Sequence, residues 1–174
     1  DMMGGTIEVN SELGKGSCFT VTLQHRLADE SYYEKKSSPT QVVSKKVLKG
    51  KRILLAEDNE LNAEITTTIL ENEGLLIDRV ADGVQCVDKM DQMPVGTYDL
   101  ILMDIQMPNM DGYQATKLIR QFADKEKADI SIIAMTANAF EEDKRNALAA
   151  GMNGHMAKPI HVDKLLLTLV ESIR

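Results

Sequence analysis

Residues 51–174 alternate two kinds of hydrophobic pattern along the chain. Short apolar runs with polar flanks predict strands that are buried on both faces. Between the runs, apolar residues recur every three or four positions, which predicts amphipathic helices. The expected strands are Arg52–Ala56, Leu76–Val80, Tyr98–Met103, Ile130–Met135 and Gly154–Ala157.

Each expected strand is followed by an expected helix, and glycines mark two of the helix ends, at Gly74 and Gly151. The apolar faces of the helices are expected to be carried by Leu61, Ile65 and Ile69; Val84, Val87 and Met90; Ala115, Leu118, Ile119 and Phe122; Phe140, Ala147 and Leu148; and Leu166, Leu169, Val170 and Ile173.

Five successive strand–helix units predict an α/β fold, a doubly wound parallel sheet with helices on both faces. Right-handed connections and a reversal of strand order place a crevice at the carboxyl ends of the central strands. We therefore expect any ligand to bind at that edge.

The front of the chain has a different pattern. Thr6–Asn10 and Cys18–Leu23 are rich in β-forming residues and are joined through the glycine-containing segment Gly14–Ser17, which predicts a β-hairpin. Residues 26–50 are polar, with Ser37-Ser38-Pro39 at their centre, as in linkers. The predicted organisation is a hairpin in residues 1–25, a linker in 26–50 and an α/β domain in 51–174.

Charge divides unevenly between the two parts of this 174-residue chain. Residues 1–50 carry seven Lys/Arg and six Asp/Glu, net +1, while residues 51–174 carry 13 and 21, net −8. An acidic domain without a basic stripe argues against nucleic-acid binding. No apolar run approaches the ~18 residues of a membrane span, and the first residues lack the pattern of a signal peptide. We therefore expect this fragment to be cytoplasmic and without membrane contact, with a membrane-anchored parent protein left open. The two cysteines, Cys18 and Cys86, have no metal-site spacing and are expected to be reduced thiols.

Three acidic residues follow strand ends: Glu57 and Asp58 after the first expected strand, and Asp104 after the third. In a doubly wound sheet these strands are neighbours, so the carboxylates are expected to converge. Carboxylates that converge repel one another, and a hard cation such as Mg²⁺ relieves the repulsion. The alternative is that they are solvated loop residues.

Thr136 and Lys158 follow the fourth and fifth expected strands, so they should reach the same crevice. Either alone would ordinarily be a surface residue. Together with the acids they suit phosphoryl chemistry, in which a carboxylate attacks phosphorus in line while a metal ion, a hydroxyl and an ammonium hold the phosphoryl oxygens.

Four segments carry a family resemblance: LLAEDN (Leu54–Asn59), LILMDIQMPNMDG (Leu100–Gly112), MTAN (Met135–Asn138) and AKPI (Ala157–Ile160). Together they resemble the receiver domains of response regulators, over roughly residues 51–174. The resemblance implies a flavodoxin-like strand order, 2-1-3-4-5, and a two-component phosphorelay function.

By this resemblance Asp104 is the phosphorylated residue and takes its phosphoryl group from a phosphohistidine. Asp58 and Asp104 are implied ligands of Mg²⁺, with Glu57 as the outer acidic partner and Gln106 giving its backbone carbonyl. The donor would be the parent kinase or a histidine-containing phosphotransfer protein.

The resemblance also implies a switch hydroxyl at Thr136 and a phosphate-binding ammonium at Lys158. Three positions before the lysine the family often has an aromatic switch residue, and this chain has His155. His155 is therefore either a reporter of phosphorylation or a surface histidine without a role.

The stretch Met2–Leu23 is similar to the last strands of a histidine-kinase ATP-binding domain. A kinase tail, a linker and a receiver follow one another in hybrid sensor kinases. The kinase's asparagine box and earlier glycine-rich boxes are not in these residues, so we expect no kinase active site and no nucleotide binding here. The alternative is an unrelated hairpin.

Two other functions are open from the sequence. One is a Mg²⁺-dependent phosphohydrolase of similar architecture with an Asp nucleophile, as in haloacid-dehalogenase-type phosphatases. Those enzymes carry a second Asp two residues after the nucleophile, where this chain has Gln106. The other is a non-catalytic receiver, which the complete set of pocket residues argues against. The oligomeric state is not determined by the sequence.

Overall fold

The computed structural model describes residues 5–22, 47–137 and 141–173. The chain divides into two units, Asp1–Ser38 and Pro39–Arg174, and each is described by itself. None of the helices in the described part of the chain has the length and apolar character needed to cross a bilayer.

The first unit contains an antiparallel hairpin of β1 (Thr6–Glu12) and β2 (Gly16–Thr22). This confirms the predicted hairpin, with β1 two residues longer than expected. Side chains alternate between the two faces of a strand, and the register pairs Ile7 with Val21 and Val9 with Phe19. These four apolar side chains therefore share one face of the hairpin, and all four are exposed.

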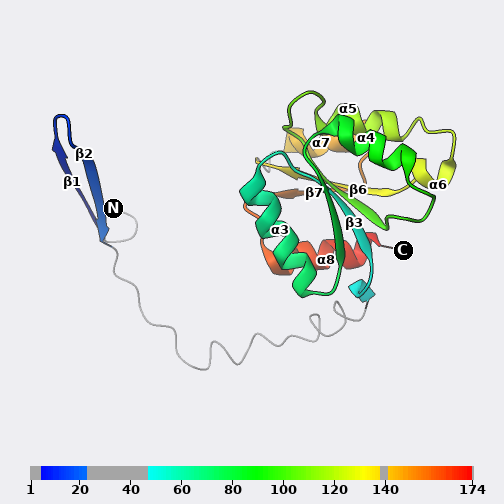
Figure 1. Ribbon diagram of the computed structural model, residues 1–174, viewed down its shortest axis with the longest axis horizontal. Coiled ribbons are helices and arrows are strands. Elements are labelled where there is room, and N and C mark those ends of the chain that lie inside the picture. Colours follow the sequence, from blue (N-terminus) through cyan, green and yellow to red (C-terminus); the bar gives the residue numbers. More distant parts are fainter. Residues whose placement is uncertain (1–4, 23–46, 138–140, 174) are drawn as a thin grey trace. The chain divides into compact units, whose positions relative to one another are not determined.

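The second unit is built on a parallel sheet of five strands in the order β4-β3-β5-β6-β7 (Figure 1). In chain order this is 2-1-3-4-5, as predicted. The strands are β3 (Arg52–Ala56), β4 (Leu76–Val80), β5 (Leu100–Asp104), β6 (Ser131–Thr136) and β7 (Gly154–Ala157).

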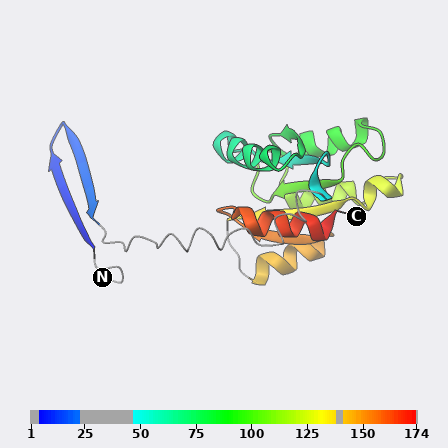
Figure 2. The same cartoon turned by 90° about the horizontal axis from the view of Figure 1, so that it is seen from below.

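Helices cover both faces of this sheet (Figures 1 and 2). On one face lie α4 (Gly83–Gln92), α5 (Gly112–Ile119) and α7 (Glu141–Ala150). On the other lie α3 (Glu60–Asn72) and α8 (Val162–Ser172). A short helix, α6 (Lys125–Ala128), follows α5 and was not predicted.

Successive residues of the central strands face opposite layers of the core. Leu54 and Ile101 pack in the layer under α4 and α5, and their neighbours Ile53 and Leu102 pack in the layer under α3 and α8. All four side chains are fully buried. Burial on both faces explains why these strands read as continuous apolar runs rather than alternating ones.

The predicted face of α3 is wrong at two of its three residues. Leu61 and Ile65 are 64% and 51% exposed, whereas Ile69 is partly buried and packs against the core. The buried residues of the helix are Ala63, Thr66 and Leu70. Both sets have helical spacing, so the period alone does not choose between them. The small Ala63 and Thr66 let the helix approach the sheet closely, and the Thr66 hydroxyl donates to a carbonyl of its own helix, that of Asn62, at 2.8 Å.

Helix α7 shows the same kind of error at one position. Ala147 is buried as predicted, but Leu148 is 54% exposed. Phe140, the third residue expected on this face, lies outside the described residues.

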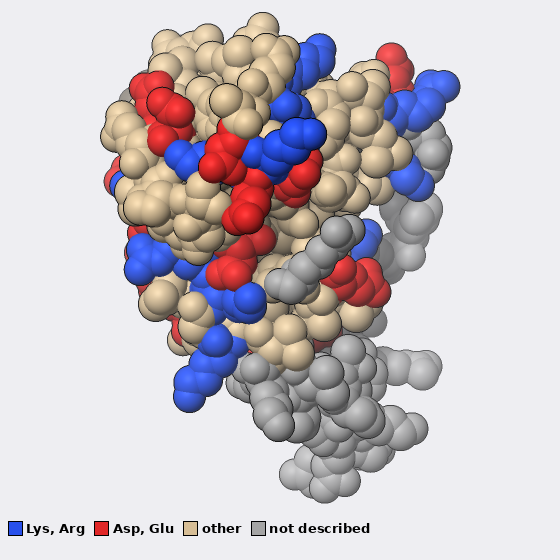
Figure 3. All heavy atoms as spheres, turned by 90° about the vertical axis from the view of Figure 1, so that its right-hand side faces the viewer, with Lys and Arg blue, Asp and Glu red and all other residues tan. Residues whose placement is uncertain are grey.

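Charged residues at the amino end of the sheet are paired. The Tyr98 hydroxyl donates to Asp78 Oδ2 at 2.7 Å, and Arg52 Nη1 lies 3.3 Å from the same oxygen. Lys51 Nζ donates to Asp99 Oδ1 at 2.8 Å. The face that includes α6 shows acidic and basic side chains interleaved rather than a basic patch (Figure 3).

Tyr98→Phe should lower the free energy of unfolding at pH 7 by about 1 kcal/mol, because a partly buried hydrogen bond to a charged acceptor is lost. The Tyr98 hydrogen bond, more than the charge of Arg52, holds the pKa of Asp78 below 3.8 against the opposing effect of burial. A depressed carboxyl pKa contributes stability above pH 3.8, which is lost as the pH falls through the folded-state pKa. The variant should therefore lose less stability between pH 5 and pH 2, in urea titrations, than the wild type. Tyr113→Phe is the matched control, and equal acid dependence of Tyr98→Phe and wild type would contradict the assignment.

Candidate functional site

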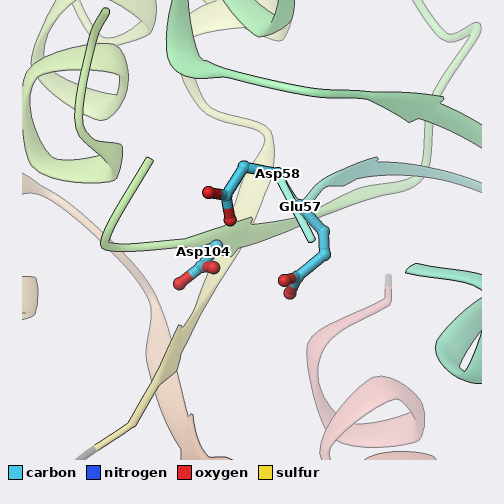
Figure 4. A group of neighbouring side chains, drawn as sticks. All are labelled: Glu57, Asp58 and Asp104. Atoms are coloured by element: carbon cyan, nitrogen blue, oxygen red, sulfur yellow. The ribbon is translucent and has the colours of Figure 1, made fainter. Parts of the chain in front are cut away.

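Three carboxylates meet at the carboxyl edge of the sheet, where β3 and β5 end side by side. Glu57, Asp58 and Asp104 each offer an oxygen within 4.8 Å of the other two (Figure 4). The β3–β5 register aligns Ala56 with Met103, so the next residue of each strand belongs to the cluster. Glu57 is fully buried, Asp104 is buried and Asp58 is exposed. The predicted convergence is thus observed.

Lys158 brings a positive charge into this cluster from the end of β7. Its Nζ donates to Asp104 Oδ2 at 2.6 Å and lies 2.6 Å from Glu57 Oε2. The Lys158 side chain is 18% exposed, so water screens these contacts little. Its backbone N–H donates to the Thr136 carbonyl at 2.7 Å, which ties the loop after β7 to the end of β6.

Burial raises the pKa of Asp104 above its usual 3.8, and the charge of Glu57 adds to the rise, while Lys158 and the backbone N–H of Gln106 oppose it. Burial alone would lower the pKa of Lys158. Hydrogen bonds to Asp104 and Glu57 outweigh that effect and raise the pKa above 10.5. The ammonium therefore stays charged at neutral pH. The ionised form of Asp104 is less stable in this pocket than it would be in water.

The set of donors suits a divalent oxygen-binding cation. Three carboxylates and one ammonium leave a net charge of −2 in a largely buried pocket, and Mg²⁺ favours carboxylate and carbonyl oxygens. The loop after Asp104 runs beside the cluster, since the backbone N–H of Gln106 donates to Asp104 Oδ1 at 3.2 Å.

Thr136 is the last residue of β6 and is 7% exposed. It lies at the same edge as Asp104, because the β5–β6 register aligns Asp104 with the preceding residue, Met135. His155 lies on β7, where it pairs with Ala134 of β6, and it is partly buried.

Two further residues hold the cluster and were missed from the sequence. Asn62, in the first turn of α3, donates from Nδ2 to Glu57 Oε1 at 3.2 Å. Arg79, on β4, donates from Nε and Nη2 to the Glu57 carbonyl, both at 3.3 Å. Asn62 lies only five residues after Glu57, but a single polar residue at that spacing gives no signal of this role. Arg79 becomes visible only once the β3–β4 register is known.

A groove of about 400 Å³ opens beside the carboxylates, between α3 and the loop after β7. Its mouth is flanked by the exposed Ile65 side chain of α3. The lining is formed by Glu57, Asn62, Ile65, Thr66, Ala137, Lys158, Pro159 and Ile160.

Sequence comparisons match most of the chain. Residues 53–170 match the family model described as the response regulator receiver domain. The chain is 34% identical over 158 residues to hybrid signal transduction histidine kinase L of Dictyostelium discoideum, covering 90% of this chain and 9% of that protein. It is 35% identical over 166 residues to the autoinducer 2 sensor kinase/phosphatase LuxQ of Vibrio vulnificus, covering 95% of this chain and 18% of that protein. The chain thus spans less than a fifth of either relative.

Structure comparisons find the same fold. The receiver domain of sensor histidine kinase PA1611 from Pseudomonas aeruginosa, with a magnesium ion coordinated in its active-site cleft, matches with a TM-score of 0.63 and 41% identity, over 71% of this chain and 97% of that one. A second match is a chain from the Saccharomyces cerevisiae co-crystal structure of the histidine phosphotransfer protein Ypd1 with the receiver domain of Ssk1. Its TM-score is 0.64 and its identity 28%, over 72% of this chain and 90% of that one.

Asp104→Asn should stabilise the metal-free protein at pH 7 by about 1 kcal/mol, because it removes a carboxylate that burial and Glu57 disfavour. A raised carboxyl pKa means that the wild type regains stability as the pH falls through that pKa and Asp104 takes up a proton. The difference between the two proteins should therefore shrink toward pH 4. Thermal unfolding in EDTA across this range measures it, and a variant less stable than the wild type at pH 7 would contradict the sign.

Proposed function

The chain belongs to the response regulator receiver family, and on that premise we propose that Asp104 accepts a phosphoryl group from a phosphohistidine donor. The observation that carries the proposal is Lys158, whose ammonium bridges Asp104 and Glu57 at 2.6 Å each beside the carboxylate cluster. A carboxylate with a charged donor at its side is arranged to receive a dianionic group that the ammonium can then hold.

In the transfer, an Asp104 carboxylate oxygen attacks phosphorus, the P–N bond of the phosphohistidine breaks, and the imidazole keeps the bonding electron pair. Lys158 shifts its hydrogen bond from Asp104 to a phosphoryl oxygen. The Thr136 hydroxyl donates to a second phosphoryl oxygen. Positioning and charge neutralisation, rather than proton transfer by a further side chain, supply the rate.

Mg²⁺ would be held by Asp58, Asp104 and the backbone carbonyl of Gln106, with Glu57 as the outer acid. The pocket's net charge and its all-oxygen donors support this assignment, as does the magnesium ion in the PA1611 receiver. When bound, the ion would neutralise the charge that builds up on the phosphoryl oxygens. Phosphorylation then draws Thr136 toward the pocket and changes α7 and β7, where His155 would report the change.

The donor docks on α3, next to the groove. Leu61 and Ile65 are exposed apolar residues on this helix. The groove that Ile65 lines extends to Lys158, which donates a hydrogen bond to Asp104. An apolar surface at the mouth of a charged pocket would bring a protein-borne phosphohistidine to the site while the transfer itself stays polar. The Ypd1–Ssk1 receiver complex supports a histidine phosphotransfer protein as one class of donor.

Residues 1–25 form the end of a kinase ATP-binding domain, residues 26–50 a linker and residues 51–174 the receiver of a hybrid histidine kinase. The LuxQ match supports this, because coverage of 95% of the chain includes most of residues 1–25. The hairpin supports it too: its exposed apolar face, with Val9 and Phe19 at the centre, is suited to packing against further parts of such a domain. The parent protein would be the kinase, and this chain would hold no kinase active site.

Asp104→Asn should abolish phosphorylation by acetyl phosphate and Mg²⁺, because no other carboxylate in the cluster lies beside both Lys158 and the Gln106 N–H. Intact mass spectrometry should find one added phosphoryl group on the wild type and none on the variant. Asp99→Asn, at the opposite end of β5, is the control and should be phosphorylated like the wild type. A full-strength adduct on Asp104→Asn would exclude it as the acceptor.

Ile65→Asp should slow transfer from a phosphorylated histidine phosphotransfer protein by about tenfold or more, because a charge is placed in an apolar contact. The same variant should react normally with acetyl phosphate, which needs no docking surface. Leu148→Asp introduces the same change at an equally exposed position on α7 and should leave both reactions unchanged. Equal loss with both donors would mean that Ile65 supports the pocket rather than the partner.

A further inference from the structure

The loop from Ile105 to Asp111 connects β5 to α5 and contains Gln106. It is closed at its base by the Gly112 N–H, which donates to the Ile105 carbonyl at 3.0 Å. A Cβ on Gly112 would lie 2.3 Å from the Asp104 carbonyl oxygen, so only glycine allows this close approach. Within the loop, the Met110 N–H donates to the Pro108 carbonyl at 2.6 Å. The outer part of the loop is held from another element.

That element is the start of α4, where Asp82 is the N-cap. Asp82 is 5% exposed, and its Oδ1 accepts from the Gln85 N–H at 2.8 Å. This backbone hydrogen bond, against the effect of burial, holds the pKa of Asp82 below its usual 3.8. The side chain is therefore a fixed, buried carboxylate at neutral pH.

The second oxygen of Asp82 reaches across to the loop. Asn109 Nδ2 donates to Asp82 Oδ2 at 2.8 Å, and the next residue, Met110, accepts from the Gly83 N–H at 3.1 Å through its carbonyl. A Cβ on Gly83 would lie 2.6 Å from that carbonyl oxygen. The loop and the helix start thus approach at van der Waals distance and are joined by a charge-assisted hydrogen bond.

We propose that Asp82 and Asn109 are a positioning pair that holds the loop, and with it the Gln106 backbone, in the conformation that binds the metal. The inference rests on the proposed function, in which the Gln106 carbonyl is a ligand. Neither Asp82 nor Asn109 belongs to the carboxylate cluster. They act through the loop backbone.

Two features separate this role from ordinary capping. The cap of α4 is made by Oδ1 of Asp82, so the Oδ2 contact is additional to it. The second feature concerns Asn109, which has φ +61°, a left-handed conformation that both Asn and glycine tolerate. Glycine would satisfy the backbone, whereas the amide of Asn109 also donates to Asp82 Oδ2 at 2.8 Å.

Asn109→Gly removes that hydrogen bond while glycine can keep the left-handed backbone. Glycine also adds backbone freedom to the loop, an effect that the exchange of Asp82 and Asn109 below controls for. A loop that spends part of its time out of place binds with a lower apparent affinity, and loss of a residue that orients metal ligands typically costs about tenfold. We expect Mg²⁺ affinity in isothermal titration to fall about tenfold. Amide exchange should become faster in residues 105–111 and stay unchanged in α3 and α8.

Exchanging the two residues provides the rescue. Asn109→Asp alone places two carboxylates opposite each other and should speed exchange in the loop. Asp82→Asn alone places two amides opposite each other, which can still form a neutral hydrogen bond once the Asn109 amide turns over, so it should speed exchange less. In Asp82→Asn/Asn109→Asp the amide and the carboxylate face each other again, Asn being an equally good N-cap. Loop exchange should return to within about twofold of the wild type. A double variant as fast as the faster single variant would overturn the pairing.

Asp124→Ala is the control for helix capping in general, since Asp124 caps α6 through the N–H groups of Glu126 and Lys127. It should lower stability without changing Mg²⁺ affinity. Wild-type affinity in Asn109→Gly would overturn the proposal, even if its loop exchanged faster, because the pair would then be only structural. Failure of the proposed metal site is recognised separately, by Mg²⁺ binding to the wild type that Asp58→Ala leaves unchanged.

Discussion

Electrostatic repulsion among three carboxylates at one edge of a rigid sheet is the constraint on which the functional site depends. Glu57, Asp58 and Asp104 extend from strands that are buried on both faces, so their backbones cannot separate to relieve the repulsion. Lys158 supplies one positive charge through two 2.6 Å contacts and leaves a net charge of −2. A divalent cation would offset this charge, and in the proposed transfer the ammonium would engage the phosphoryl group. Metal binding, phosphoryl transfer and the proposed switch would then all depend on the same unbalanced charge.

Two parts of the α/β unit build the pocket: the central strands, which fix the carboxylates, and the loops that complete the pocket and would respond to phosphorylation in the proposed function. The central strands, with fully buried side chains such as Leu54 and Ile101, keep the carboxylates in register. The loops that complete the pocket are tied to other elements by hydrogen bonds: Lys158 to the Thr136 carbonyl, and the loop after Asp104 to Asp82 through Asn109. In the proposed switch these loops are the parts that would move, because a phosphoryl group offers only a few hydrogen bonds with which to move the chain. In the proposed function, the exposed apolar residues on α3 would add a surface at which a protein donor, rather than a small molecule, is recognised.

Sequence reasoning found the residues that carry charge at strand ends and missed those that orient them. Glu57, Asp58, Asp104 and Lys158 each follow an apolar run, so the strand pattern predicts their positions. Asn62 and Arg79 hold Glu57 from a helix and from an edge strand, and Asp82 meets Asn109 across 27 positions of sequence. Single polar residues at such positions carry no local signal. Leu61 and Ile65 were wrongly assigned to the buried face of α3 for a related reason, since two stripes of helical spacing were available and packing against the sheet selected Ala63, Thr66 and Leu70.

The sequence by itself determined the order of strands and helices, the doubly wound architecture and the edge at which the acids gather. These follow from local patterns: runs long enough to be buried strands, helical periods between them, and polar residues placed directly after strand ends. Tertiary structure alone decided which face of α3 is covered, which side chains hold Glu57, and how the loop after Asp104 is tied to the start of α4. Those outcomes depend on distances between segments far apart in the chain. A change of tenths of an ångström in such a distance decides whether a hydrogen bond or a close contact forms. Periodicity and strand order place a residue only to within an element, which is too coarse to choose its partner.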